Sequence, residues 1–280
     1  MKSVIAAGIA ACVLTGVASA QQRPLVTEDP ETVGGGNILI EGGVDYQREV
    51  FYPTSGLTGH LLRMPTLGVS IGLSSIAELQ IDGGFYNRLT VTSREPAPLS
   101  GELLFDGDET TDVEDLVIAT KIRVVSETQG RPAFALRLAT RLPNASTESG
   151  IGLDTMDFFA SLLAGKTVQS IRVVGNAGIG ILTDPTRGFR QNDVFTYGLS
   201  FARAVQQGVE VVGEINGRVG LRDNDTPVGT ESRSVLRFGG RFTRGTVRVD
   251  GGLLIGLTTP DTTVGFTAGV TWVFRGFSVP

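Results

Sequence analysis

Apolar and polar residues alternate with a period of two in segment after segment of this chain. Between residues 37 and 46, Ile38, Ile40 and Val44 share one face of an extended strand, while Glu41 and Asp45 share the other. Because successive side chains of a β-strand point to opposite faces, the pattern predicts strands with one apolar and one polar face. The same alternation recurs at 66–73, 78–85, 115–124, 134–142, 157–165, 171–182, 194–202, 209–221, twice within 232–252, and at 264–274.

The stretch 232–252 shows what the two faces are suited to. Arg233, Arg237 and Arg241 fall on one face, and Leu236 and Phe238 fall on the other. An arginine facing lipid at the middle of a bilayer costs roughly 2–4 kcal/mol, whereas one facing a watery lumen does not. A closed barrel also pairs every backbone group, which hydrocarbon requires. The alternation therefore favours a transmembrane barrel with apolar residues toward lipid and charged residues inside.

The links between the predicted strands alternate in length. Short links at 74–76, 127–130, 167–170, 205–208 and 243–245 are interleaved with longer ones at 48–60, 88–112, 143–154, 183–192, 222–230 and 258–263. Outer-membrane barrels have this asymmetry between periplasmic turns and outer loops. The predicted fold class is therefore all-β, a transmembrane antiparallel up-and-down barrel of about twelve strands. A large soluble β-sandwich or a β-helix is the competing prediction, because the strands of a sandwich also alternate.

The N-terminal region divides the chain into its expected parts. Residues 1–20 contain one lysine, an uncharged apolar run and an Ala-Ser-Ala end, which is typical of a cleaved signal peptide. A lipoprotein signal ending at Cys12 is the alternative. We expect a flexible N-terminal segment at 21–36, the barrel at 37–274 and a C-terminal tail at 275–280, in the bacterial outer membrane. Residues 21–36 are polar and end in glycines, which favours a periplasmic tail over a plug folded into the lumen.

Composition narrows the possible functions. Cleavage would remove Lys2 and take the net charge from −5 to −6, and this acidity argues against a nucleic-acid partner. With a single histidine, His60, and no cysteine after Cys12, we expect no transition-metal site and no cofactor. His60 has no nearby serine for a Ser–His pair, so we expect no enzymatic activity. The acidic stretch 106–115 could collect Ca²⁺ but lacks the spacing of a dedicated calcium loop.

The inward charges are the candidate site residues. Both signs occur, so these groups either pair and hold the barrel rigid or create a field that selects solutes; both alternatives stay open. The candidates are Glu41, Asp45, Glu78, Asp82, Lys121, Arg123, Arg137, Arg141, Arg172, Glu210, Glu214, Arg218, Arg233, Arg237, Arg241 and Arg248. The interior of an eight-stranded barrel is filled by side chains, and a sixteen-stranded barrel encloses an aqueous channel. A twelve-stranded barrel lies between these cases, so we expect a pore of modest width.

Three stretches carry a family resemblance: LVIATKIR at 116–123, RLATRLPN at 137–144 and GLDTMDFF at 152–159. With them the chain resembles the outer-membrane channel proteins associated with meta-cleavage phenol-degradation pathways. The resemblance covers most of the expected mature chain as a pattern of strands and loops. It implies a twelve-stranded barrel for passive uptake of small, aromatic or apolar compounds. One departure is that Phe274, where an assembly-recognised aromatic would end the chain, is followed by six more residues.

The sequence thus predicts an outer-membrane channel for passive passage of small solutes. The alternative is a non-conducting barrel whose outer loops bind a partner or lipopolysaccharide. The expected partners are outer-membrane lipid and lipopolysaccharide, the barrel-assembly machinery and a small-molecule solute, with no nucleic acid.

Overall fold

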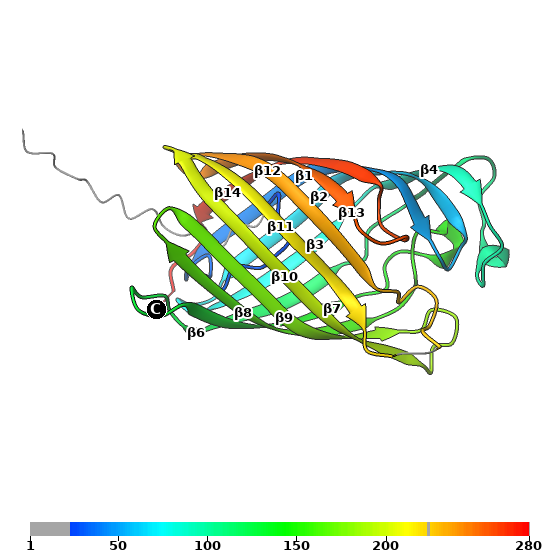
Figure 1. Ribbon diagram of the computed structural model, residues 1–280, viewed down its shortest axis with the longest axis horizontal. Coiled ribbons are helices and arrows are strands. Elements are labelled where there is room, and N and C mark those ends of the chain that lie inside the picture. Colours follow the sequence, from blue (N-terminus) through cyan, green and yellow to red (C-terminus); the bar gives the residue numbers. More distant parts are fainter. Residues whose placement is uncertain (1–22, 223–224, 280) are drawn as a thin grey trace, which may run out of the picture.

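In the computed structural model, the described residues 23–222 and 225–279 form one closed antiparallel β-barrel (Figure 1). The predicted signal peptide, with Cys12, lies outside the described residues. The strands are β1 (Asn37–Tyr52), β2 (Leu57–Gly72), β3 (Ala77–Gly84), β4 (Asn87–Arg94), β5 (Glu109–Asp112), β6 (Val117–Val125), β7 (Ala133–Arg141), β8 (Asp157–Val168), β9 (Ile171–Thr183), β10 (Gln191–Gln206), β11 (Val209–Gly220), β12 (Arg233–Arg244), β13 (Val247–Gly256) and β14 (Val264–Arg275). Two short 3₁₀ helices, η1 (Ser100–Glu102) and η2 (Thr147–Ser149), lie in the loops.

The barrel wall consists of twelve strands, as predicted. β3 and β4 follow one another along the same edge of β2, and β6 and β5 pair with them in turn, so these four segments make two strands of the wall. Every later strand pairs with its neighbours in the chain. β1 pairs with both β2 and β14, which closes the barrel. Closure leaves no unpaired sheet edge along the wall.

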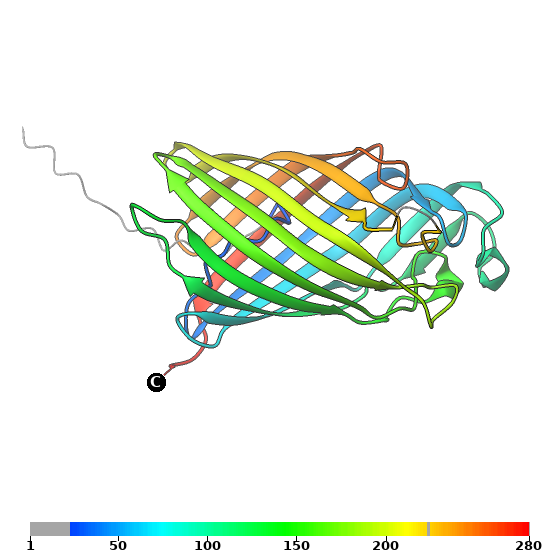
Figure 2. The same ribbon diagram turned by 60° about the horizontal axis from the view of Figure 1, so that its bottom comes forward.

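The two ends of the barrel differ. The short turns and the C-terminal end of the described chain lie at one end, which we call the short-turn end, and the long loops lie at the other, the outer end (Figures 1 and 2). Two predicted long links are wrong. In place of the link 48–60 there is a four-residue turn, because β1 continues to Tyr52 and β2 already begins at Leu57. The link 88–112 contains two strands, β4 and β5. These extensions are stabilised by an apolar cluster at the outer end, formed by Val50, Leu57, Leu61, Leu89 and Val91 with Tyr52, Leu103, Phe105 and Ile151.

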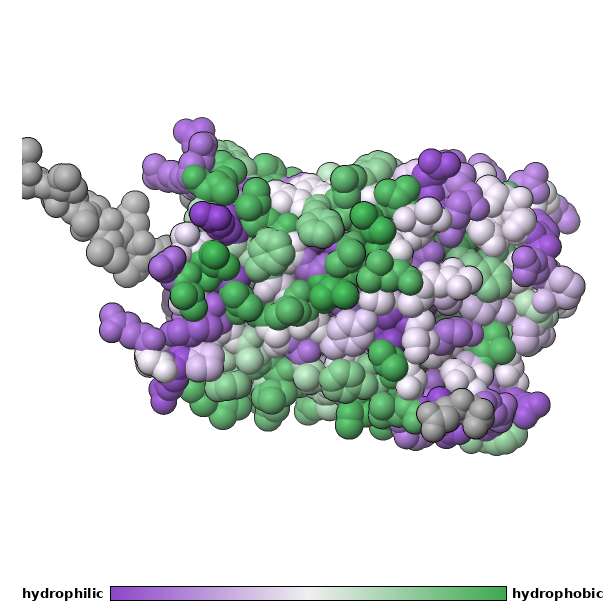
Figure 3. Space-filling view, in the orientation of Figure 1, coloured by the Kyte–Doolittle hydropathy of each residue, from purple (hydrophilic) through white to green (hydrophobic). Residues whose placement is uncertain are grey.

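Large apolar side chains cover the outside of the wall, where Figure 3 shows an apolar surface across the middle of the barrel. Leu138, Phe158, Ile179 and Leu199 are each about half exposed there. Side chains that follow outward-facing residues in the sequence, such as Ala139 after Leu138 and Leu163 after Leu162, are buried inside. Of the helices in the described residues, none has both the length and the apolar character needed to cross a membrane.

Candidate functional site

Residues 23–33, which we call the lumen segment, lie inside the barrel. Leu25, Thr27 and Val33 are buried, and Leu25 packs against the inward-facing Ala202 and Val212. The expected placement as a periplasmic tail is therefore wrong for these residues, and the alternative of a segment folded into the lumen is the one observed. The segment joins β1 through Gly34, Gly35 and Gly36.

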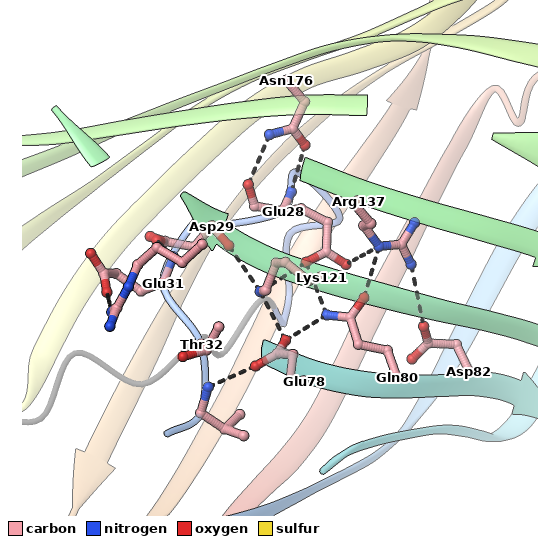
Figure 4. A network of polar contacts seen from close by, with 12 residues as sticks. Glu28, Asp29, Glu31, Thr32, Glu78, Gln80, Asp82, Lys121, Arg137 and Asn176 are labelled. Atoms are coloured by element: carbon pink, nitrogen blue, oxygen red, sulfur yellow. Dashed lines mark hydrogen bonds and ion pairs between the residues drawn. The ribbon is translucent and has the colours of Figure 1, made fainter. Parts of the chain in front are cut away.

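Glu28 stands at the centre of a buried network of charges (Figure 4). Its carboxylate lies 3.4 Å from Lys121 Nζ on β6 and 3.2 Å from Arg137 Nε on β7. Lys121 is fully buried and also lies 2.9 Å from Glu78 Oε1 on β3, and Gln80 donates to both glutamates. Because charges shielded from water are costly unless paired, this network ties the lumen segment to three strands of the wall.

Wall side chains also satisfy the backbone of the lumen segment, which forms neither a helix nor a strand. Glu214 on β11 accepts from the amides of Val26 and Thr27, at 2.9 and 2.8 Å. Glu78 accepts from the amide of Val33 at 2.7 Å, and Asn176 on β9 both accepts from the Glu28 amide and donates to the Glu28 carbonyl. Buried backbone groups need such partners, so these side chains specify the path of the segment.

A second group of ion pairs holds the segment at the short-turn end. Arg172 on β9 forms a two-pronged hydrogen bond with Asp29 and also binds Glu127 in the β6–β7 turn, while Arg123 binds Glu31. Burial would raise the pKa of Glu127, but the hydrogen bond from the Thr167 amide and the Arg172 charge outweigh it and hold the pKa below its ordinary value. Glu127 therefore stays ionised and keeps Arg172 in position.

Glycines in the wall make room for the lumen segment. A Cβ added at Gly198 on β10 would meet Thr27 at 2.8 Å from Oγ1 and 3.2 Å from Cγ2. A Cβ added at Gly165 on β8 would lie 2.9 Å from the ring of Pro30. A side chain at either position would therefore press on the segment.

Two cavities flank the lumen segment. The larger, about 430 Å³, is bordered by the segment from Arg23 to Val26 and by charges of both signs from the wall: Glu41, Asp45, Asp82, Arg63, Arg137 and Arg237, with Glu114 from the outer end. The smaller, about 190 Å³, lies against Val26, Thr27 and Glu28 on the side of Ser161, Asn176 and Thr196. Phe159, which follows the outward-facing Phe158 on β8, borders both cavities. The lumen is thus polar, charged and divided by the segment.

The structure brings the candidate site residues together in groups along the lumen. Seven of them contact the lumen segment directly: Asp45, Glu78, Lys121, Arg123, Arg137, Arg172 and Glu214. Arg237 pairs with Glu214, Asp82 lies 3.8 Å from Arg137, and Glu41 accepts from Thr271. Toward the short-turn end, Glu210 pairs with Arg241 and Arg248. Toward the outer end, Arg141 pairs with Asp157. Arg218 and Arg233, also at the outer end, donate to carbonyl oxygens of the loops. Their role in selecting solutes stays a prediction.

The sequence did not single out the lumen segment's own charges or its polar wall partners. Arg23 binds Thr66 and Thr267 and lies 3.6 Å from Asp250, whose side chain is fully buried. Gln80 and Asn176 were overlooked because amides carry no charge to mark them. The available signal was the cluster of three acids in TEDPE at 27–31, which matches the excess of bases on β6, β7 and β9.

Groups suited to other chemistry are sparse in the part of the chain that the structure describes. His60 lies on β2 at the outer end, 3.4 Å from a Glu49 carboxylate oxygen. Among the described residues, no group of three or more histidine, cysteine or acidic side chains is arranged to hold a metal ion.

No protein-family model and no curated protein matches the chain. Among solved structures, an outer-membrane channel from Pseudomonas putida F1 is similar over 88% of this chain and 98% of that chain, with a TM-score of 0.62 and 12% identity. The NanC porin (86% and 100% covered, TM-score 0.49, 8% identity) and the translocator domain of the autotransporter NalP from Neisseria meningitidis (85% and 89%, TM-score 0.47, 12% identity) are less similar. At 12% identity, the similarity to the Pseudomonas putida channel establishes the fold alone, which is that of an outer-membrane β-barrel.

Proposed function

We propose that this protein is an outer-membrane channel for the passive passage of small solutes, and that the lumen segment controls the path. The observation that carries the proposal is the cavity of about 430 Å³ inside a closed barrel, lined by charged side chains. A cavity of this size falls within the range that binds small molecules. The segment separates this cavity from the smaller one, so passage requires the segment to move or to leave a path beside it.

Charged lining groups favour small polar solutes over apolar ones, because an apolar solute would replace water around charges without offering hydrogen bonds. The resemblance to channels of phenol-degradation pathways suggests aromatic compounds instead. Phenols combine the aromatic ring that the resemblance suggests with a hydroxyl group that can form hydrogen bonds with the charged lining. They are therefore the aromatic solutes to compare with sugars and amino acids of similar size.

A second candidate is a barrel that does not conduct and acts through its outer loops, by binding a partner or lipopolysaccharide. Two observations favour it. Ion pairs hold the lumen segment across the lumen, and the loops at the outer end share an apolar cluster around Leu57 and Leu89, both fully buried. Loops with their own core present a defined surface.

Solute-driven swelling of liposomes tests the two candidates. The refolded mature protein is compared with a Gly198→Ala variant, in which the new methyl group presses on Thr27. A channel controlled by the segment should swell liposomes in a size-dependent way, and faster in the variant. Absence of swelling in both proteins, each shown to be folded by resistance to detergent until boiled, would reject the channel and support the second candidate.

A further inference from the structure

Three arginines at the short-turn end have no partner within the described part of the protein. They are Arg131 in the β6–β7 turn, Arg203 near the end of β10 and Arg244 at the end of β12, which we call the rim arginines. All three are exposed. Glu127, in the same turn as Arg131, is already paired with Arg172 and lies 3.5 Å from Lys166. The free charges that we find at this end are therefore positive.

The outer end carries free charges of both signs, including the exposed arginines Arg187 and Arg222. Exposed carboxylates without an ion pair in the described structure cluster in the loop between β4 and β5, at Glu95, Glu102, Asp106 and Asp108. Because these carboxylates are also free, the rim arginines are not part of a surface that is basic throughout. The net charge of the chain is −5, so free positive charge at one end stands out against the total.

The apolar surface of the wall reaches two of the rim arginines, Arg203 and Arg244. Arg203 lies between Phe201 and Val205 on the outward face of β10, and both neighbours are about half exposed. Arg244 follows Phe242 on the outward face of β12 in the same way. An arginine at the margin of an apolar surface extends its hydrocarbon stem along that surface and places the guanidinium at headgroup level. At that level the partner with matching geometry is a phosphate, which a guanidinium binds with two hydrogen bonds.

We propose that the rim arginines bind the phosphate groups of anionic phospholipids in the leaflet at the short-turn end. Each basic residue near an anionic membrane surface contributes roughly a fivefold preference for that lipid. The rim arginines are distributed along the wall from the β6–β7 turn to β12, so the contacts fix the depth of the barrel over a broad part of its circumference. This inference does not depend on whether the barrel conducts.

The single tryptophan of the chain, Trp272, allows a direct test. Trp272 on β14 is half exposed on the outward face and pairs with Val247, which pairs with Arg244. Two strand spacings place the backbones of Trp272 and Arg244 roughly 10 Å apart. Lipids bound at Arg244 therefore lie within the short range over which brominated acyl chains quench tryptophan fluorescence.

The protein is refolded into vesicles with equal fractions of phosphatidylglycerol and phosphatidylcholine, and one lipid or the other is brominated. We expect quenching of Trp272 to give a relative binding constant of about five in favour of phosphatidylglycerol, falling toward one in Arg244→Gln and in high salt. Arg187→Gln, at an exposed arginine of the outer end, is the matched control and should leave the constant unchanged. A constant near one in the wild-type protein, or equal values in wild type and Arg244→Gln, would overturn the proposal. If Arg244→Gln does not fold, the salt dependence of the wild-type binding constant tests the proposal instead.

Discussion

Replacing Lys121 with methionine should release the lumen segment from its position. Lys121 Nζ lies 2.9 Å from Glu78 and 3.4 Å from Glu28 and donates to the Asp29 carbonyl at 2.9 Å, in a fully buried environment. Removing one partner of a buried ion pair costs about 3–5 kcal/mol because the remaining charge is uncompensated. Once the segment leaves, water reaches both glutamates, so the cost falls on the docked state. At 1.36 kcal/mol per factor of ten, the docking equilibrium should shift on the order of a hundredfold or more.

The assay uses a single cysteine as a reporter of docking. The expected mature chain contains no cysteine, and Thr27→Cys introduces one at a buried position of the segment. The Thr27 hydroxyl makes no hydrogen bond, so the substitution removes none. A thiol reagent labels the introduced cysteine when the segment is undocked, so the labelling rate at fixed reagent concentration follows the fraction undocked. We expect Lys121→Met to raise this rate on the order of a hundredfold, in line with the shift in docking.

Lys166→Met is the matched control. Lys166 binds the carbonyl oxygens of the β6–β7 turn and does not contact the lumen segment, so its removal should leave the labelling rate of the introduced cysteine close to that of the parent. Both variants are first shown to keep the heat-modifiable migration of a folded barrel. A rate increase of less than tenfold in folded Lys121→Met would show that the buried charges do not hold the segment.

Three further predictions follow from the same contacts. Gly198→Ala should undock the segment through overpacking, at a cost of about 1–3 kcal/mol, and adding Thr27→Ala should restore the wild-type rate of liposome swelling. Arg237→Ala leaves Glu214 without its arginine, so the reversal potential in a planar bilayer should shift toward cation selectivity; an unchanged potential would remove Arg237 from the path. The pKa of Glu127 is held below the ordinary value of a glutamate, so its stabilisation is present above that ordinary value and is lost as the pH falls through the lowered one; Glu127→Gln should flatten this part of the plot of melting temperature against pH.

The barrel was predictable because lipid and lumen impose opposite requirements on alternate residues. The pattern failed where the strands leave the membrane. β1 shifts register against β2 between Gln47 and Val50, and Glu49 there has a φ of 51°, which indicates a bulge. A bulge adds a residue and breaks the period of two, so the sequence appeared to enter a loop although the strand continues.

The lumen segment was not predictable from its own residues. Leu25 and Val33 are too few to suggest burial, and the acids and prolines around them are typical of an exposed tail. What holds the segment is its pairing with Lys121 and Arg172, which lie more than 90 residues away in the sequence. Alternation places such partners on the inner face of the barrel, but it does not show which charge on that face meets which charge of the segment.

The contacts of the lumen segment also set an order on folding. Glu78, Lys121, Asn176 and Glu214 come from strands spread from β3 to β11, so the complete binding surface for the segment exists only after those strands have paired. Contacts between residues this far apart in sequence form slowly, because the intervening chain must first be ordered. Docking of the segment is therefore a late event in biogenesis, and a newly closed barrel passes through a stage in which its charged interior is open to water.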